Sequence, residues 1–252
     1  MQLVFSIVNK MNNLDKKENC LTSASSNPRQ NSCYEKDAKR SLIWPPPQAS
    51  PKFNPRLNLG VMASGNGSNF EALVKAIQNS QLDAYISILV VNNPNCEASR
   101  RAKRLGVPCV IHNHREFSSR EELDKALVNT FTNHAVEGVV MAGWMRIVTP
   151  ILIAAFPNRL INIHPSLLPS FRGLDAVGQA LKARVPISGC SVHLVTPQVD
   201  DGPVLAQAAV PVLSSDDHQS LSERIQRMEH QLLPLSVALA GQNWRNEAQN
   251  QG

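Results

Sequence analysis

An asparagine and a histidine stand two positions apart in the stretch L-I-N-I-H-P-S-L-L-P, residues 160–169. The apolar residues before them predict a buried strand, and Pro165 ends it because proline cannot donate to a strand ladder. Side chains alternate along a strand, so Asn162 and His164 should point to the same side. A carboxamide and an imidazole directed at one point suit a developing oxyanion and a proton transfer. A histidine at a strand end is also compatible with a structural role.

A carboxylate for this histidine is available in V-D-D-G-P, residues 199–203, which falls between two predicted strands. These are favourable turn residues, so a plain turn is one interpretation. In the other, Asp200 or Asp201 lies near His164, orients its ring and stabilises its protonated form. The remaining histidines lie on predicted polar loops or helix faces, and His193 alternates within a strand, where packing is the expected role.

A glycine-rich turn, S-G-N-G-S-N at residues 64–69, precedes a predicted helix. Backbone N–H groups and the helix dipole make such a helix N-terminus an anion site. Gly67 allows close backbone approach, and Ser68 and Asn69 offer further donors. The turn lacks the third glycine of a dinucleotide fingerprint and the lysine of a Walker loop, which favours a phosphomonoester over NAD or ATP. The alternative is a turn that only caps the helix.

Strands and helices alternate along the chain from residue 57. Apolar runs predict strands at 57–63, 85–91, 108–111, 138–142 and 159–163, and helical spacing predicts helices at 70–77, 96–105, 118–133 and 149–156. A helix at 175–183, strands at 189–195 and 204–212, and a final helix at 217–240 follow. We predict an α/β fold with a Rossmann-like, doubly wound, mostly parallel sheet and an antiparallel strand pair near the C-terminus. Ligands of such a sheet gather at the carboxyl ends of its strands.

Composition divides the chain into three parts. Residues 1–56 are rich in Asn, Ser, Lys and Pro, and we expect a disordered extension or residues upstream of the true translation start. Residues 57–242 should form the domain, and residues 243–252 a polar tail. The first part holds nine basic and four acidic residues and so carries the whole formal charge of +5, which leaves the rest neutral. Small-molecule substrates are therefore expected, and no nucleic acid.

The cysteines and apolar runs set the expected compartment. The five cysteines show no Cys-x-x-Cys pair and no zinc-finger spacing, so we expect no metal site, no disulfide framework and a cytoplasmic location. No run of 18 apolar residues predicts a membrane span, and the N-terminal apolar run lacks the flanks of a signal peptide. Either a monomer or a homodimer fits this sequence.

The chain from about Leu57 to Ala240 resembles the phosphoribosylglycinamide formyltransferases, folate-dependent enzymes of purine synthesis. The matching motifs are S-G-N-G-S-N-F, S-R-E-E-L-D at 119–124, V-V-M-A-G-W-M-R-I-V at 139–148, N-I-H-P-S-L-L-P at 162–169, S-V-H-L-V at 191–195 with D-D-G-P-V-L-A-Q at 200–207, and M-E-H-Q-L-L-P-L at 228–235. The resemblance implies transfer of a formyl group from 10-formyltetrahydrofolate, the donor co-substrate, to the amine of 5'-phosphoribosylglycinamide.

The resemblance also implies roles for single residues. Asn162 would hydrogen-bond the formyl oxygen, His164 would be the general acid, and Asp200 would orient His164 and stabilise its protonated form. The residues expected to bind phosphoribosylglycinamide are Gly67, Ser68, Asn69 and Glu229. The residues expected to hold the folate are Arg120, Met145, Arg146, Ile147, Val148 and Asn162. Taken alone, M-A-G-W-M-R-I-V would indicate only a buried strand that runs into a turn.

Two stretches depart from the family pattern. Asp201 stands where the family often has glycine after the catalytic aspartate, and P-S-F-R-G-L-D-A at 169–176 resembles methionyl-tRNA formyltransferases. Those enzymes would need a further basic domain after the catalytic one, and formyltetrahydrofolate hydrolases a sensing domain in front and a second histidine where this chain has Pro165. From another class, a non-catalytic nucleotide-binding module is the alternative, and the three candidate catalytic residues together argue against it.

Overall fold

The computed structural model describes residues 42–250, with side chains up to residue 247. The disorder expected for residues 1–41 lies outside this range. The described chain forms one eight-stranded sheet in the order β1-β8-β7-β6-β5-β2-β3-β4. Its strands are β1 (Leu42–Trp44), β2 (Leu57–Ala63), β3 (Ala84–Val91), β4 (Cys109–Ile111), β5 (Gly138–Met141), β6 (Leu160–His164), β7 (Ile187–Leu194) and β8 (Val204–Pro211).

The sheet has a parallel part, β6-β5-β2-β3-β4, and an antiparallel part, β1-β8-β7, which joins it at β6. β2 pairs in parallel with both β3 and β5, and β3 with β4 and β5 with β6 are also parallel. β6 with β7, β7 with β8, and β8 with β1 are antiparallel. The prediction of a mostly parallel sheet with antiparallel C-terminal strands is confirmed. The strand order turns around β2, which makes the carboxyl ends of β2, β5 and β6 the expected place for a ligand.

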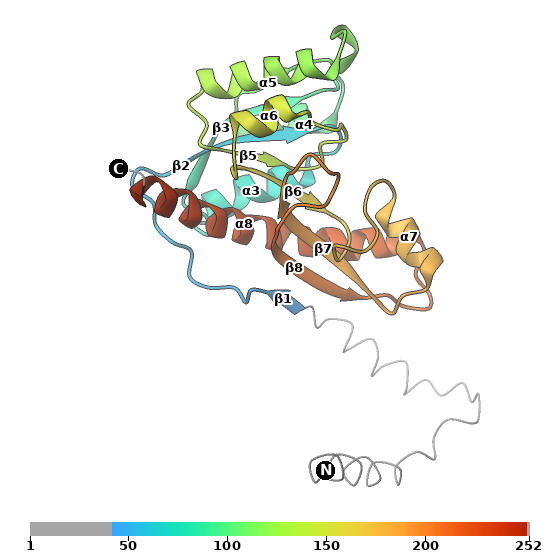
Figure 1. The fold of residues 1–252 in the computed structure, drawn as a ribbon. Helices are drawn as coiled ribbons and strands as arrows, with labels where there is room; N and C mark the ends of the chain where they lie inside the picture. The colour runs from blue at the N-terminus through green and yellow to red at the C-terminus, as the bar shows by residue number, and fades with distance from the viewer. Residues whose placement is uncertain (1–41, 251–252) are drawn as a thin grey trace, which may run out of the picture. The chain divides into compact units, whose positions relative to one another are not determined.

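Helices cover both faces of the sheet (Figure 1). They are α3 (Ser68–Gln78), α4 (Glu97–Leu105), α5 (Arg120–Asn133), α6 (Pro150–Ala155), α7 (Ala176–Ala183) and α8 (His218–Asn250), with a 3-10 turn η1 at His114–Glu116. The larger apolar core joins α3, α4 and α8 to one face of the sheet. A second core joins α5 and α6 to the other face. None of the helices within residues 42–250 is long and apolar enough to cross a membrane.

The predicted start of the domain at residue 57 is too late. β1 adds an antiparallel strand to the edge of the sheet, with Ile43 opposite Ala208. Phe53 belongs to the larger core, and its backbone N–H donates to Asp83 Oδ2 at 2.7 Å. Residues 42–56 are therefore part of the folded domain. The signal was weak because a three-residue strand is too short to show periodicity and becomes a strand only through its pairing with β8.

We expect a chain that begins at residue 57 to be less stable than one that begins at Leu42. Removing Phe53 from the core alone should cost about 2 kcal/mol, and a loss of that size lowers the melting temperature of a domain of this length by about 4–8 °C. Thermal unfolding of the two chains side by side measures the difference. Equal melting temperatures would show that residues 42–56 add nothing to the fold.

The predicted end of the last helix at 240 is also wrong, and so is the predicted polar tail at 243–252 as far as residue 250, beyond which the structure describes nothing. α8 continues to Asn250, and Trp244 is only 2% exposed. The Trp244 indole Nε1 donates to the carbonyl of Asn158 at 2.8 Å. Its ring lies against Gly138 of β5, where a Cβ would come within 2.2 Å of the indole. The polar residues around Trp244 concealed a helical apolar stripe that runs from Val237 through Gly241 to this position.

Candidate active site

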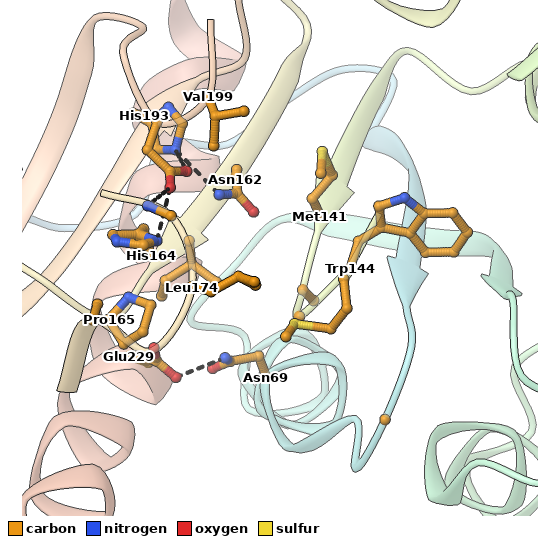
Figure 2. A pocket seen from close by; sticks show the side chains of 18 of the residues that line it. Asn69, Met141, Trp144, Asn162, His164, Pro165, Leu174, His193, Val199 and Glu229 are labelled. Atoms are coloured by element: carbon orange, nitrogen blue, oxygen red, sulfur yellow. Dashed lines mark hydrogen bonds and ion pairs between the residues drawn. The ribbon is translucent and has the colours of Figure 1, made fainter. Parts of the chain in front are cut away.

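A cavity of about 910 Å³ opens where β2, β5 and β6 end. All but one of the predicted site residues line it: Gly67, Ser68, Asn69, Met145, Arg146, Ile147, Val148, Asn162, His164, Asp200 and Glu229. In Figure 2 the polar side chains of Asn162, His164 and His193 occupy one side of this cavity, and Met141 and Trp144 occupy the other. The cavity thus has a polar wall and an apolar wall.

The imidazole of His164 is buried between two acceptors. Its Nδ1 lies 3.3 Å from Asp200 Oδ2, and its Nε2 donates to the carbonyl of Phe171 at 2.8 Å. β6 ends at His164, and the side chains of Asn162 and His164 both reach the cavity, as strand alternation predicted. A carboxylate and a carbonyl can only accept, so both contacts are satisfied when both ring nitrogens carry protons. Acceptors on both sides therefore fix the orientation of the ring.

Asp200 sits in the turn between β7 and β8 with a left-handed backbone, φ 51°. Its Oδ2 also accepts the backbone N–H of Gly173 at 2.9 Å. Burial raises the pKa of Asp200, but hydrogen bonds from His193 and Gly173 and the charges of His164 and His193 outweigh it and hold the pKa below its ordinary value. The carboxylate is therefore ionised at neutral pH beside the imidazole.

His193 is a site residue that the sequence reasoning assigned to packing. It lies opposite Asn162 in the antiparallel pairing of β6 with β7. Its Nε2 is 3.1 Å from Asn162 Nδ2, a contact drawn as a dashed line in Figure 2, and 3.5 Å from Asp200 Oδ1. His193 thus joins the amide of Asn162 to the carboxylate. The missed signal was the register: only the pairing of the two strands reveals which side chain faces Asn162.

His218 was also set aside from the sequence. It is the first residue of α8, it lines the cavity, and its Nε2 lies 2.9 Å from Asp175 Oδ1. Both side chains of this pair are largely exposed. His218 therefore marks the rim of the cavity, away from the buried group around His164.

The glycine turn at 64–69 delivers the N-terminus of α3 to the cavity. Gly67 is the N-cap with φ 75°, and a Cβ there would lie 2.7 Å from Ala98 of α4. The turn packs this closely on α4 because the Ala98 N–H donates to the Gly65 carbonyl at 3.0 Å. The first N–H groups of a helix have no partner within it, so they are free to bind an anion in the cavity.

Arg101 of α4 fastens the same turn from outside. Its Nε donates to the Asn66 carbonyl and its Nη2 to Asn66 Oδ1, both at 2.8 Å. Its Nη1 also pairs with Glu71 of α3. Hydrogen bonds from Lys75, and then from Arg101 and Arg104, outweigh desolvation and lower the pKa of Glu71 to about 2. Three cations around one carboxylate leave this end of α3 with net positive charge.

Glu229 of α8 meets Asn69 at the other side of the turn. Asn69 Nδ2 donates to Glu229 Oε2 at 2.8 Å (Figure 2). Burial raises the pKa of Glu229, and the hydrogen bond from Asn69 opposes this only in part. Asn69 Oδ1 is buried with no hydrogen-bond partner among the described residues. A ligand hydroxyl or amine placed here could donate to both groups.

The loop after β5 forms the apolar wall and is tied down at both ends. Met145 N–H donates to Ser64 Oγ at 2.8 Å, and Ser64 N–H donates to the Gly143 carbonyl at 3.0 Å. At its far end the N–H of Thr149 donates to the buried Asp124 of α5 at 2.5 Å. Met145 is 70% exposed, so its side chain is free to cover a ligand. The loop presents backbone groups along an apolar surface.

Arg120 is the one predicted site residue that the cavity lacks. It is the first residue of α5, its side chain is exposed, and it does not line the cavity. The same motif reaches the site through Asp124, which holds Thr149. Sequence matching located the motif but could not tell which of its side chains faces the cavity.

The cavity thus combines an amide donor, an imidazole paired with a carboxylate, and an anion site. An amide aimed at a carbonyl oxygen stabilises a tetrahedral adduct, and the imidazole can protonate a departing nitrogen. Within residues 42–250 no group of three or more His, Cys, Asp or Glu side chains is placed to hold a metal ion. Acyl transfer to a phosphorylated acceptor is the chemistry that these groups suit best.

Known proteins match this chain over the same region. The family model for formyl transferase matches residues 57–237. A phosphoribosylglycinamide formyltransferase of Bacillus subtilis is 37% identical over 188 residues, which cover 74% of this chain and 96% of that protein. A trifunctional purine biosynthetic protein adenosine-3 of Drosophila pseudoobscura is 42% identical over 187 residues, but the match spans only 14% of its length.

A solved structure repeats the fold. The glycinamide ribonucleotide transformylase 1 of Symbiobacterium toebii superposes with a TM-score of 0.72 at 38% identity, and covers 73% of this chain and 86% of that one. The region matched by the family model, residues 57–237, ends within α8, which continues to Asn250. β1, which lies before residue 57, falls outside the matched family region.

Proposed function

Because the chain belongs to the formyl transferase family, we propose that it transfers a formyl group from 10-formyltetrahydrofolate to the amine of 5'-phosphoribosylglycinamide. The products are 5'-phosphoribosyl-N-formylglycinamide and tetrahydrofolate, in the synthesis of the purine nucleotide IMP. The observation that carries the proposal is the shared cavity, where the Asn162, His164 and Asp200 group faces the anion site at the N-terminus of α3. An acyl-transfer centre beside a phosphate site matches a phosphorylated amine as acceptor.

The reaction proceeds by addition and elimination. The lone pair of the acceptor amine forms a bond with the formyl carbon, and the carbonyl electrons move to the oxygen, where Asn162 Nδ2 donates to them. When the carbonyl re-forms, the bond from carbon to the folate nitrogen breaks, and His164 gives that nitrogen its proton. The acceptor nitrogen releases a proton to solvent, and His164 regains one from solvent before the next cycle. Asp200 keeps the His164 ring oriented through the contact at Nδ1.

The two substrates occupy different parts of the cavity, the acceptor at the glycine turn and the folate at the apolar wall. The phosphate lies at Gly67, Ser68 and Asn69, and Glu229 accepts hydrogen bonds from the ribose or the amine. The folate ring lies along residues 145–148, which offer main-chain groups on an apolar surface. A contact between Arg120 and a part of the donor that extends beyond the cavity stays a prediction. A cytoplasmic location and a monomeric or homodimeric state also stay proposals.

A direct assay tests the proposed reaction. The purified chain is incubated with 10-formyltetrahydrofolate, with and without phosphoribosylglycinamide, and the acceptor is followed by mass spectrometry. We expect formyl transfer that depends on the acceptor and shows saturation in both substrates. Release of tetrahydrofolate at the same rate without the acceptor would contradict the proposal.

Arg101 offers a sharper test of the phosphate site. We expect Arg101→Gln to raise KM for phosphoribosylglycinamide about tenfold, the equivalent of about 1.4 kcal/mol, because the turn loses both bonds to Asn66. KM for the folate and kcat should change less than about twofold, since Arg101 touches neither the folate wall nor His164.

Arg104→Gln is the matched control for Arg101→Gln. Arg104 also pairs with Glu71, but it makes no hydrogen bond to Asn66. Steady-state kinetics of the two variants separate the fastening of the turn from the loss of one charge. Equal acceptor KM values in both variants would show that the bonds to Asn66 do not matter.

A further inference from the structure

We propose that Arg172 and Asp201 form an ion pair that positions the catalytic histidine and aspartate, and that this pair sets kcat. The inference rests on the proposed reaction for its kinetic test. Arg172 Nη2 lies 2.5 Å from Asp201 Oδ1. The pair joins the loop between β6 and α7 to the turn between β7 and β8, the two segments that border the buried group around His164. Neither residue lines the cavity.

The neighbours of Arg172 in the chain make the catalytic contacts. The carbonyl of Phe171 accepts from His164 Nε2, and the N–H of Gly173 donates to Asp200 Oδ2. Three consecutive residues therefore make these contacts: Phe171 binds His164, Arg172 binds Asp201, and Gly173 binds Asp200. Any movement of this loop away from the β7–β8 turn changes the contacts on both nitrogens of the His164 ring and on the carboxylate beside it.

The backbone of both segments adopts a conformation that has to be maintained by contacts such as the ion pair. Phe171, Gly173 and Asp200 all have left-handed backbones, with φ of 57°, 77° and 51°. For the two residues other than glycine this conformation is disfavoured and has to be maintained by the surrounding contacts. The loop is fastened on its other side by Gln179, whose Nε2 donates to the carbonyls of Arg172 and Leu174. The ion pair supplies the fastening toward Asp200.

The ion pair should affect the positions of His164 and Asp200 more than the stability of the fold. Its side chains are 44% and 41% exposed, and solvent screens an ion pair of that kind so that it adds little to folding. Catalysis is more sensitive, because a shift of about 1 Å in a reacting group can cost about 10²-fold in rate. Arg172 and Asp201 are therefore positioning residues, which act through Phe171, Gly173 and Asp200.

Removing each charge of the pair, and then swapping the two residues, tests whether the ion pair controls kcat. We expect Arg172→Ala and Asp201→Ala each to lower kcat about tenfold, with KM for both substrates within about twofold. The two changes together should be no worse than either alone, because both remove the same interaction. The double exchange Arg172→Asp with Asp201→Arg should recover at least half of the wild-type kcat. Unchanged kcat in both single variants, or no recovery in the exchange, overturns the proposal.

A second ion pair of similar kind serves as the control. Arg100 and Glu97 of α4 pair at 3.1 Å and are also exposed, and neither lines the cavity. We expect Arg100→Ala to leave kcat unchanged. Raising the ionic strength should lower kcat of the wild type and of Arg100→Ala, and have less effect on Arg172→Ala, because salt screens the exposed pair that the last variant lacks.

Amide hydrogen exchange gives a readout that needs no activity. The Gly173 N–H is bonded to Asp200, so its exchange should be protected in the wild type and faster in Arg172→Ala and Asp201→Ala. Equal exchange of residues 171–173 in all three proteins overturns the proposal even if the chain transfers no formyl group. Failure of the proposed reaction and failure of the ion pair are thus told apart.

Discussion

Replacing His164 with alanine lowers kcat for formyl transfer by about 10²- to 10⁴-fold, the usual contribution of a general acid. The folate nitrogen is a poor leaving group until it is protonated, and His164 lies on the polar wall with its Nδ1 3.3 Å from Asp200 Oδ2. KM for the two substrates should change little, because the phosphate turn and the 145–148 loop are held by other contacts. Steady-state kinetics of the purified variant measure both quantities.

A histidine outside the cavity is the control for this variant. His112 Nε2 contacts Thr130 Oγ1 at 2.8 Å, and burial lowers the pKa of His112, but it does not line the cavity. We expect His112→Asn to keep full kcat. Thermal unfolding of both variants shows whether either is misfolded. A folded His164→Ala protein with wild-type kcat would contradict the assigned chemistry.

Replacing Asp200 with asparagine should lower kcat about 10²-fold or more, because the amide keeps the shape but cannot stabilise a protonated imidazole. The contribution of Asp200 to the stability of the fold also depends on pH, in one direction. The pKa of Asp200 is depressed in the folded protein, so its ionised form stabilises the fold above the unfolded-state pKa of about 4. That stabilisation is lost as the pH falls through the lower folded-state pKa. Asparagine does not titrate, so the Asp200→Asn protein should not lose this stabilisation as the pH falls.

Two measurements check the Asp200 variant. Kinetics at neutral pH give kcat, and chemical unfolding at neutral pH and at about pH 3 gives the change in unfolding free energy between them. We expect a smaller change in Asp200→Asn than in the wild type. The control for kcat is Asp217→Asn at the start of α8, where asparagine is an equally good helix cap and the side chain does not line the cavity. Full kcat in Asp200→Asn would remove the carboxylate from the mechanism.

Local patterns predicted the parts of the fold whose signals are local. β2, β3 and β5 are buried apolar runs, and the helices between them carry helical apolar spacing, so each could be located from its own residues. β1 and the end of α8 could not. Three residues of β1 show no period, and Trp244 is buried only because Gly138, far away in the chain, leaves space for its ring.

The residues of the site also fall into those that local sequence predicted and those that it could not. Asn162 and His164 share one strand, so alternation alone placed them together. His193 required the register between β6 and β7, which no short stretch of sequence contains. The two departures from the family pattern, in the loop at 169–176 and at Asp201, were separate observations in the sequence. In the structure they are partners, because Arg172 of that loop pairs with Asp201.

The most direct measurement of the central claim is a comparison of acceptors. The full chain is given 10-formyltetrahydrofolate together with phosphoribosylglycinamide, with charged initiator tRNA, or with water alone, and formyl transfer is followed to saturation. We expect kcat/KM for phosphoribosylglycinamide to exceed that for the tRNA by several orders of magnitude, with hydrolysis near background. Comparable transfer to the tRNA, or rapid hydrolysis without an acceptor, would contradict the account.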